Sequence, residues 1–427
     1  MPSLGAELVQ SRDEIEARSF QRPLSPLIRI MPRFAYLFAR FPSFSQTFCY
    51  REVAELHRQG EAPAIFSIRR PDNEPAQDWD EQIVGRVEYL PGEPQLTREI
   101  EDLLKRAALP QPIVDLVEEW GERSDFLRLY QAVHLGPRLA SAGINHVHAH
   151  FAGMAARTAF WINKFFGIPF SFTAHANDIF APHEFEVSVG KLIEAASAIV
   201  TVSDYAADFL KEQFRPQATK IYRIYNGLDL SKFKRADLVA SVPTIITIGR
   251  LIDKKGFADL IRACELLKKR GRDFGCEIIG EGPLEDQLRA QIAELDLGSQ
   301  VSLAGPKTQR EIVERLAAAT VFVLPSLVDS DGARDNLPTV IMEAMAAGLP
   351  VVSTSVGGIP EMIVANKTGL LVQPGDVAAL ANAIDQVIVD LALSKKIGQR
   401  GWERAKELFS IEKNARELVA TITRGRN

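Results

Sequence analysis

The sequence predicts an α/β protein with two doubly wound, Rossmann-like domains that face each other across a cleft. Short apolar runs alternate with longer amphipathic segments, this alternation starts twice, and 427 residues suffice for two domains with full cores. Strands that alternate with helices in this way are typical of parallel sheets covered on both faces. Because such sheets bind ligands at the carboxyl ends of their strands, we expect a shared site in the cleft.

The first half of the chain opens with a βαβ unit and is expected to form a domain over residues 33–240. Residues 1–32 precede it without sustained periodicity and are expected to form a loosely held leader. The predicted strands of this domain are Phe34–Ala39, Ala64–Ile68, Val147–His150, Phe170–Ala174, Ala198–Val202 and Ile221–Ile224. The predicted helices are Cys49–Arg58, Leu96–Ala108, Ile113–Trp120, Asp125–Ala142, Met154–Phe166 and Asp204–Gln213.

A second start at Thr244–Ile248 opens a domain that is expected to span residues 241–405. Its predicted strands are Thr244–Ile248, Cys276–Ile279, Val301–Ala304, Val321–Leu324 and Pro350–Thr354. Its predicted helices are Phe257–Arg270, Leu284–Glu294, Gln309–Ala318, Pro338–Ala347 and Val377–Leu391. Residues 406–427 hold a final helix, Ile411–Thr423, which we expect to pack back onto the first domain.

Two carboxylates flank the start of the predicted helix Pro338–Ala347. Pro338 suits the first helical position, and Gly348 suits a left-handed residue just past the helix end. Asp335 then lies in the loop before the helix while Glu343 lies inside it, so both acids can point into one crevice. This spacing predicts a site for a ligand with hydroxyl groups. It is equally compatible with an ordinary αβ unit whose acids are solvated.

Cationic and backbone groups predict a phosphate site beside these acids. The helix start offers free amide groups that, together with the helix dipole, attract an anion. These amides belong to Asn336, Leu337 and Thr339. The glycine-bounded loop Gly249–Phe257 follows the first strand of the second domain and carries Arg250 and Lys255. Two such cations can neutralise a diphosphate, the arginine by bidentate hydrogen bonds and the lysine as a point charge.

Two further loops follow strands of the second domain. In Gly280–Pro283, which includes Glu281 and Gly282, absent side chains would let the backbone approach a flat or charged ligand. The loop Gly305–Lys307, which includes Pro306, could present backbone groups to a nucleobase. Either loop alone is a weak signal, because most such glycines only make turns. The conjunction of all these loops is what favours a nucleotide site.

Composition limits the other classes of function. A formal net charge of −5 argues against a nucleic-acid binder, although it leaves room for a local basic patch against a membrane. The three cysteines have no metal-site spacing, and we interpret them as reduced cytosolic thiols. No apolar run reaches the ~18 residues typical of a spanning helix, and acids and arginines occupy the N-terminus where a secretory signal would be apolar. We expect a cytoplasmic protein, with peripheral membrane contact left open.

Taken in order, these motifs resemble the donor domain of retaining GT-B glycosyltransferases of family four. The shared pattern is G-R-x4-K-G, then G-x-G-P, then a carboxylate-x7-Glu segment continuing as E-A-M-A-x-G-x-P-V-V, then G-G-x-x-E. The resemblance covers about Arg33–Thr423. The segment D-G-A-R-D-N-L-P most resembles members that build bacterial surface polysaccharides. The resemblance as a whole implies a GT-B fold and a UDP- or GDP-linked sugar as donor, with no metal and no other cofactor.

The family pattern implies roles for particular residues of this chain. Arg250 and Lys255 would hold the diphosphate and stabilise the leaving group, while Glu343 would accept hydrogen bonds from the ribose hydroxyls. Asp335 would contact the hydroxyls of the transferred sugar. At this position the family more often has Glu, followed by Gly rather than Asn336. The acceptor implied is a saccharide or a lipid-linked saccharide.

The first domain would complete the site on the acceptor side. The segment Phe41–Phe48 resembles the acceptor-side loop of the same subgroup, and its polar candidates are Ser43, Ser45 and Gln46. Ser43 or Ser45 could instead simply cap the following helix. In family members a histidine that ends H-V-H-A-H, or the histidine of T-A-H-A-N-D, lies against the transferred sugar. By that resemblance His150 and His175 would orient sugar hydroxyls.

Two alternative functions remain open from the sequence. Alternate residues of a strand point the same way, so His146, His148 and His150 could bind one metal ion in a metal-dependent hydrolase. That interpretation needs additional carboxylate ligands and leaves the cation pair and the acid pair unexplained. The other alternative is a catalytically silent binder of sugar nucleotides.

Overall fold

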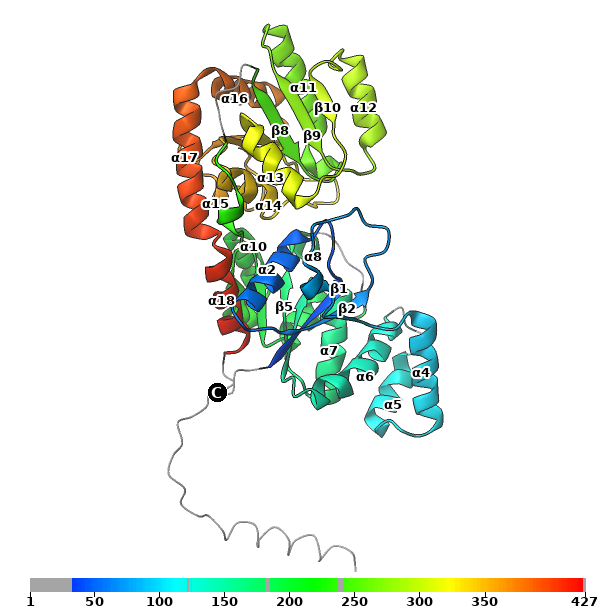
Figure 1. Cartoon of the computed structure of the whole chain (residues 1–427). Coiled ribbons are helices and arrows are strands. Elements are labelled where there is room, and N and C mark those ends of the chain that lie inside the picture. The colour runs from blue at the N-terminus through cyan, green and yellow to red at the C-terminus, as the bar shows by residue number, and fades with distance from the viewer. Residues whose placement is uncertain (1–32, 121–122, 124, 181–184, 237–241, 425–427) are drawn as a thin grey trace, which may run out of the picture. The chain divides into compact units, whose positions relative to one another are not determined.

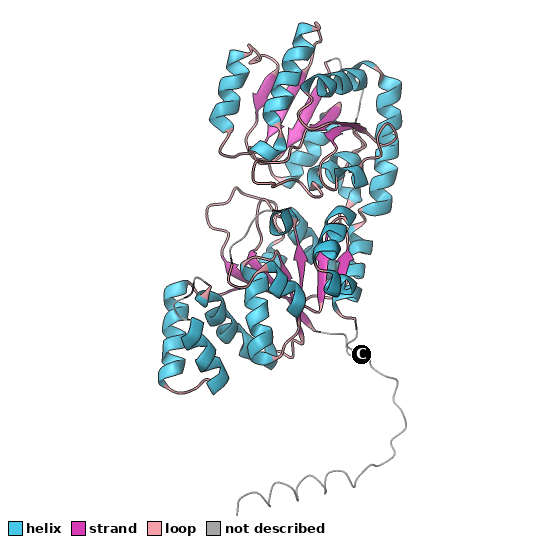
Figure 2. Ribbon diagram, turned by 180° about the vertical axis from the view of Figure 1, so that it is seen from behind, coloured by secondary structure: helices cyan, strands magenta, loops and turns pink. Residues whose placement is uncertain are grey.

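The computed structural model describes residues 33–427, apart from 121–122, 124, 181–184, 237–241 and 425–427. The leader expected at 1–32 therefore lies outside the described residues. The described chain forms two parallel sheets, each with helices on both faces (Figures 1 and 2). This arrangement confirms the predicted fold class.

The first sheet has the strand order β3-β2-β1-β4-β5-β6-β7, and every neighbouring pair is parallel. Its strands are β1 (Phe34–Arg40), β2 (Ala64–Arg69), β3 (Val87–Tyr89), β4 (His146–His150), β5 (Phe170–Ala174), β6 (Ala198–Thr201) and β7 (Ile221–Arg223). The helices of this half are α2 (Thr47–Arg58), α3 (Glu81–Val84), α4 (Glu93–Lys105), α5 (Gln111–Trp120), α6 (Phe126–Ser141), α7 (Met154–Phe166), α8 (Ala176–Phe180), α9 (Val189–Ala195) and α10 (Asp204–Gln213).

The second sheet has the order β10-β9-β8-β11-β12-β13 and is also parallel throughout. Its strands are β8 (Thr244–Ile248), β9 (Gly275–Ile279), β10 (Val301–Leu303), β11 (Val321–Leu324), β12 (Val351–Thr354) and β13 (Leu370–Val372). The helices are α11 (Phe257–Lys269), α12 (Glu285–Glu294), α13 (Gln309–Ala318), α14 (Thr339–Ala346), α15 (Ile359–Met362), α16 (Val377–Val389), α17 (Leu391–Leu408) and α18 (Ile411–Ile422).

Helix α18 packs against α2, at the first sheet (Figure 1). Ala415, Leu418 and Ile422 share a buried cluster with Phe34 and Tyr36 of β1. Among the described residues, no individual helix is both long and apolar enough to cross a membrane. The helices α16 and α17, which meet at a bend of 100°, reach the required length and composition only when taken together.

Each sheet reverses its winding direction at one point, between β1 and β4 in the first and between β8 and β11 in the second. The loops that leave such a pair of strands diverge and open a crevice at the carboxyl edge of the sheet. The second switch point brings the loop that carries Lys255 next to the loop that carries Asp335. The first brings the segment after β1 next to His150. The topology therefore positions residues that lie far apart in the sequence.

Several elements differ from expectation. The edge strands β3 and β13, each of three residues, were not predicted. Helix α17 was not predicted because the residues it buries include Ser394, Gly398, Gly401 and Ala405, which form no apolar stripe. Pro338 is the N-cap of α14 rather than its first residue, with ψ of 114°.

Gly256 joins the turn that carries Lys255 to helix α11, and we expect Gly256→Ala to destabilise the protein. Gly256 has φ of +67°, and an added Cβ would lie 1.9 Å from the carbonyl oxygen of Pro325. Gly271 has a similar φ of +72°, but an added Cβ there would meet nothing within 4 Å. Gly271→Ala should lower the free energy of unfolding by ~1–2 kcal/mol, the cost of the left-handed backbone. Gly256→Ala should lower it by about 3 kcal/mol.

Urea titration of both variants measures this difference, since they share the backbone conformation and differ in the collision with Pro325. Equal losses in the two variants would contradict the close approach at Gly256.

Candidate functional site

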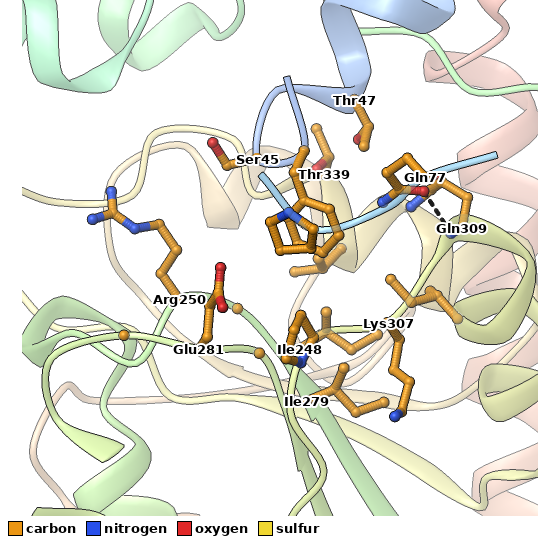
Figure 3. Close-up of a pocket in the computed structure, with 18 of the residues that line it drawn as sticks. Ser45, Thr47, Gln77, Ile248, Arg250, Ile279, Glu281, Lys307, Gln309 and Thr339 are labelled. Atoms are coloured by element: carbon orange, nitrogen blue, oxygen red, sulfur yellow. Dashed lines mark hydrogen bonds between the residues drawn. The ribbon is translucent and has the colours of Figure 1, made fainter. Parts of the chain in front are cut away.

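A cavity of about 760 Å3 receives residues from both halves of the chain. This volume lies within the range of small-molecule and cofactor sites, ~300–1,000 Å3. Figure 3 shows Ser45, Thr47 and Gln77 from the first half in its upper part, and Glu281 and Lys307 from the second half in its lower part. The cavity therefore lies among loops that follow strands of both sheets.

Most of the residues predicted for the donor side line this cavity. They are Gly249, Arg250, Lys255, Glu281, Gly282, Pro306, Pro338, Thr339 and Glu343, and Ser45 of the acceptor-side loop joins them. Other predicted residues do not line it, namely Asp335, Asn336, Leu337, His150, His175, Ser43 and Gln46. Of this second group, Asp335 contacts the first directly, through the side chain of Lys255.

Lys255 and Asp335 form an ion pair at the wall of the cavity. The Lys255 Nζ lies 2.8 Å from both carboxylate oxygens of Asp335, and the Ser326 hydroxyl donates a 2.7 Å hydrogen bond to Oδ2. A Cβ at Gly357 would lie 2.1 Å from the carbonyl oxygen of Asp335, so the glycine pair of G-G-x-x-E allows this loop to pack closely. Asp335 was expected against the sugar, and here it fixes the ammonium group of Lys255.

The start of α14 reaches the cavity only in part. Pro338 and Thr339 line it, whereas Asn336 and Leu337 are buried outside its lining. The Asn336 side-chain oxygen accepts a hydrogen bond from the Ser203 hydroxyl, which belongs to the first half of the chain. Of the three residues expected to supply amides to an anion, only Thr339 therefore lies at the cavity wall. Asn336 instead connects the two halves.

Glu343 is almost fully buried and pairs with a residue that the sequence analysis missed. One of its oxygens accepts a hydrogen bond from the Arg51 guanidinium, which also donates to the side-chain oxygen of Gln309. Arg51 lies on α2, and Gln309 is the first residue of α13. The carboxylate predicted to hold ribose thus already contacts a cation from the first half of the chain.

The loop that follows β1 is organised by Glu74. Its carboxylate accepts hydrogen bonds from the Ser43 hydroxyl at 3.0 Å and from the Phe44 amide at 2.6 Å. The N-cap of α2 is Gln46, which makes no side-chain capping bond, so the alternative of a cap by Ser43 or Ser45 is wrong.

Glu74 belongs to the polar, proline-bearing segment 71–80, whose generic chemistry singled out no residue in the sequence. In the same segment Gln77 accepts a 3.0 Å hydrogen bond from the Gln309 amide (Figure 3).

Histidines of β4 are held by hydroxyls of β5. His146 lies 2.7 Å and His148 lies 2.8 Å from the Ser171 hydroxyl, and the other nitrogen of His148 lies 3.0 Å from that of Thr173. The metal-like group that the described residues bring together is Glu52, His148 and His150, not the predicted three histidines. Both ring nitrogens of His148 therefore already have a hydrogen-bond partner, the Ser171 and the Thr173 hydroxyl.

His150 belongs to a buried network with Glu52 and His175. Its Nε2 lies 3.0 Å from Glu52 Oε1, and its Nδ1 lies 3.4 Å from His175 Nε2. Burial alone would lower the pKa of His150, but Cys49 and the Glu52 carboxylate raise it to about 10. Burial and the charge of His150 lower the pKa of His175. One protonated imidazole therefore lies beside a neutral one.

Phe151 follows His150 with φ of +69°, a strained conformation for a bulky residue. Its ring packs on His175 with 4.4 Å between centroids, and the Phe48 ring packs on the same histidine at 4.8 Å. The two phenyl rings and the network behind them fix the position of His175.

Comparison with known proteins identifies relatives along nearly the whole chain. The model of "Glycosyltransferase Family 4" matches residues 45–232, and that of "Glycosyl transferases group 1" matches residues 231–404. The chain is 32% identical to the amylovoran biosynthesis glycosyltransferase AmsK of Erwinia amylovora, over 80% of this chain and 87% of that protein. It is 27% identical to the putative colanic acid biosynthesis glycosyltransferase WcaL of Salmonella typhimurium, over 91% and 98% respectively.

Solved structures share the fold. A glycosyltransferase from Rickettsia africae superposes with a TM-score of 0.70 at 19% identity, over 92% of this chain and 99% of that one. At this level of identity the likeness concerns the fold alone. The fold is that of GT-B glycosyltransferases, as the motifs of the sequence implied.

Glu52→Gln should lower the pKa of His150, because it removes the carboxylate that stabilises the imidazolium. Because the folded protein holds the His150 proton more tightly than the unfolded chain, this proton stabilises the fold. The contribution is complete below pH ~6.5, where the unfolded chain is also protonated, and it is lost as the pH rises toward about 10. Histidine NMR titration and stability measured against pH check both effects.

Glu55→Gln is the matched control, since Glu55 lies on the same helix and pairs with Arg58. An unchanged His150 titration in Glu52→Gln would contradict the network.

Proposed function

The chain belongs to glycosyltransferase family 4, and from that premise we propose that it moves a sugar from a nucleoside diphosphate donor to a saccharide or lipid-linked acceptor, retaining the anomeric configuration. The observation that carries this proposal is one cavity lined by Arg250, Lys255 and the start of α14. The relatives AmsK and WcaL are named for the biosynthesis of amylovoran and colanic acid. By analogy we assign the reaction to the assembly of a cell-surface polysaccharide.

The chemical task is to stabilise charge as the bond between sugar and diphosphate breaks. Negative charge then grows on the phosphate oxygens, and fixed cations and amides that face them lower the barrier. Arg250 is exposed at the cavity, while Lys255 is held in place by Asp335. These two cations and the amide of Thr339 would stabilise the negative charge on the phosphate oxygens, as a divalent ion does in other transferases. The proposed transfer is therefore independent of metal.

The rest of the donor would extend along the same cavity. Glu343 would accept hydrogen bonds from the ribose, and the loop around Pro306 would face the nucleobase. Glu281 and Gly282 lie beside Arg250 in the lining and would approach the phosphates or the sugar through the backbone. The base, uracil or guanine, is not distinguished by these residues.

The acceptor would enter from the first half of the chain, where Ser45 and Thr47 reach the cavity. His150 and His175 would orient hydroxyls of the transferred sugar. We place the reaction in the cytoplasm, with contact to the inner face of the membrane when the acceptor is lipid-linked.

The assay that tests this function incubates the protein with UDP- and GDP-linked sugars and measures release of nucleoside diphosphate, with and without saccharide acceptors. We expect acceptor-dependent release that persists in excess EDTA, with the product retaining the donor's anomeric configuration by NMR. Loss of activity with EDTA would favour a metal at Glu52, His148 and His150 instead. Binding without release would indicate a silent binder.

Arg250→Ala should lower kcat by about 10²–10³, the usual effect of removing one donor to a developing anion. Arg250 forms no ion pair among the described residues, so its removal leaves no buried carboxylate unpaired. Lys255→Ala should act similarly but also destabilise the fold, because Asp335 loses its partner.

Lys254→Ala is the control, since Lys254 bonds to Asn177 and does not line the cavity. Near-wild-type turnover in Arg250→Ala would contradict the assigned role.

A further inference from the structure

Two buried polar atoms lie unpaired on neighbouring side chains. The Arg51 Nη1 and the Glu343 Oε2 have no hydrogen-bond partner among the described residues, although Arg51 Nη2 and Glu343 Oε1 pair with each other. The two side chains are 14% and 2% exposed. An unpaired buried polar atom is destabilising, so such atoms in a native structure call for an explanation.

These atoms lie where two cavities meet. Glu343 lines the main cavity, and Arg51 lines a second one of about 450 Å3. Thr47 and Gln309 line both cavities, and Gln309 also accepts a hydrogen bond from Arg51. The pair Arg51–Glu343 therefore lies at the boundary between the two cavities, with Glu343 on the side of the main one.

An unpaired donor beside an unpaired acceptor selects a particular ligand chemistry. A phosphate would suit the guanidinium but would be repelled by the carboxylate, and an ammonium group would do the opposite. A hydroxyl group suits both, because it accepts a hydrogen bond from Arg51 and donates one to Glu343. A sugar ring with adjacent hydroxyls can satisfy both atoms at once.

We propose that Arg51 is a donor-binding residue that, together with Glu343, holds a ribose hydroxyl of the nucleotide. The inference rests on the proposed function, because that function places a nucleotide in the main cavity. Hydrogen bonds between an uncharged hydroxyl and two charged partners are stronger than neutral ones, and both partners are already fixed by their mutual ion pair.

This assignment makes donor binding a contact between the two halves of the chain. Arg51 lies on α2 of the first half, and Glu343 lies on α14 of the second. The residue after Arg51 is Glu52, which contacts His150. A ribose held by Arg51 therefore fixes the helix that also positions His150. Two neighbouring residues of α2 would then have separate contacts, Arg51 with the nucleotide and Glu52 with His150.

The test measures dissociation constants by calorimetry for UDP and GDP and for their 2′-deoxy and 3′-deoxy analogues. Wild-type protein should bind one of the two diphosphates and lose about tenfold in affinity when the contacted hydroxyl is absent. Arg51→Ala should lose about tenfold for the ribonucleotide and show little further loss for the deoxy analogue. Arg58→Ala is the control on the same helix, because Arg58 is exposed and pairs with Glu55.

Arg51→Lys is the second variant, which keeps the charge beside Glu343 if Arg51→Ala fails to fold. It should retain diphosphate binding while losing most of the preference for the ribonucleotide, because an ammonium lacks the forked geometry. Unchanged discrimination in the Arg51 variants would overturn the inference. Tighter binding in them would also overturn it and would make Arg51 a competitor of the ribose for Glu343.

Wild-type protein that binds a diphosphate without discriminating its deoxy analogues would overturn the inference and leave the proposed function standing. Wild-type protein that binds neither diphosphate would overturn both.

Discussion

The ion pair between Lys255 and Asp335 is the constraint on which the rest of the site depends. It joins the loop after β8 to the loop after β11, the two strands at the switch point of the second sheet. Both side chains are largely buried, so the pair is weakly screened and its geometry is fixed before any ligand binds. A cation held in this way needs little reorganisation when charge develops beside it, which is the condition for electrostatic catalysis.

The second sheet, and many of the residues that line its side of the cavity, could be predicted because their signals are local. Gly348, the run around Arg250 and the spacing from Asp335 to Glu343 each lie within one loop-helix unit. Helix α17 has no such local signal. In the sequence Gly398 and Gly401 argue against a helix, whereas in the structure they permit close packing. The family resemblance added roles, but it did not reveal that Asp335 contacts Lys255.

The first half of the site was harder to predict because its key contacts join distant segments. Glu52 lies between Cys49 and Leu56 on the buried side of α2. A carboxylate among apolar residues of a helix was the one feature of the sequence that could have indicated a buried polar contact. Arg51 gave none, since its partner Glu343 lies on α14. The alternative of a metal site at His146, His148 and His150 could not be judged from the sequence for a similar reason, because the hydroxyls that contact His146 and His148 belong to the neighbouring strand.

If fixed cations bind the diphosphate, the affinities of a nucleoside diphosphate and its monophosphate should differ between wild-type protein and Arg250→Ala. Arg250 lines the cavity together with Lys255 and Thr339. We expect the wild type to prefer the diphosphate by about tenfold or more and the variant to lose most of this preference. The same preference in both proteins would contradict it.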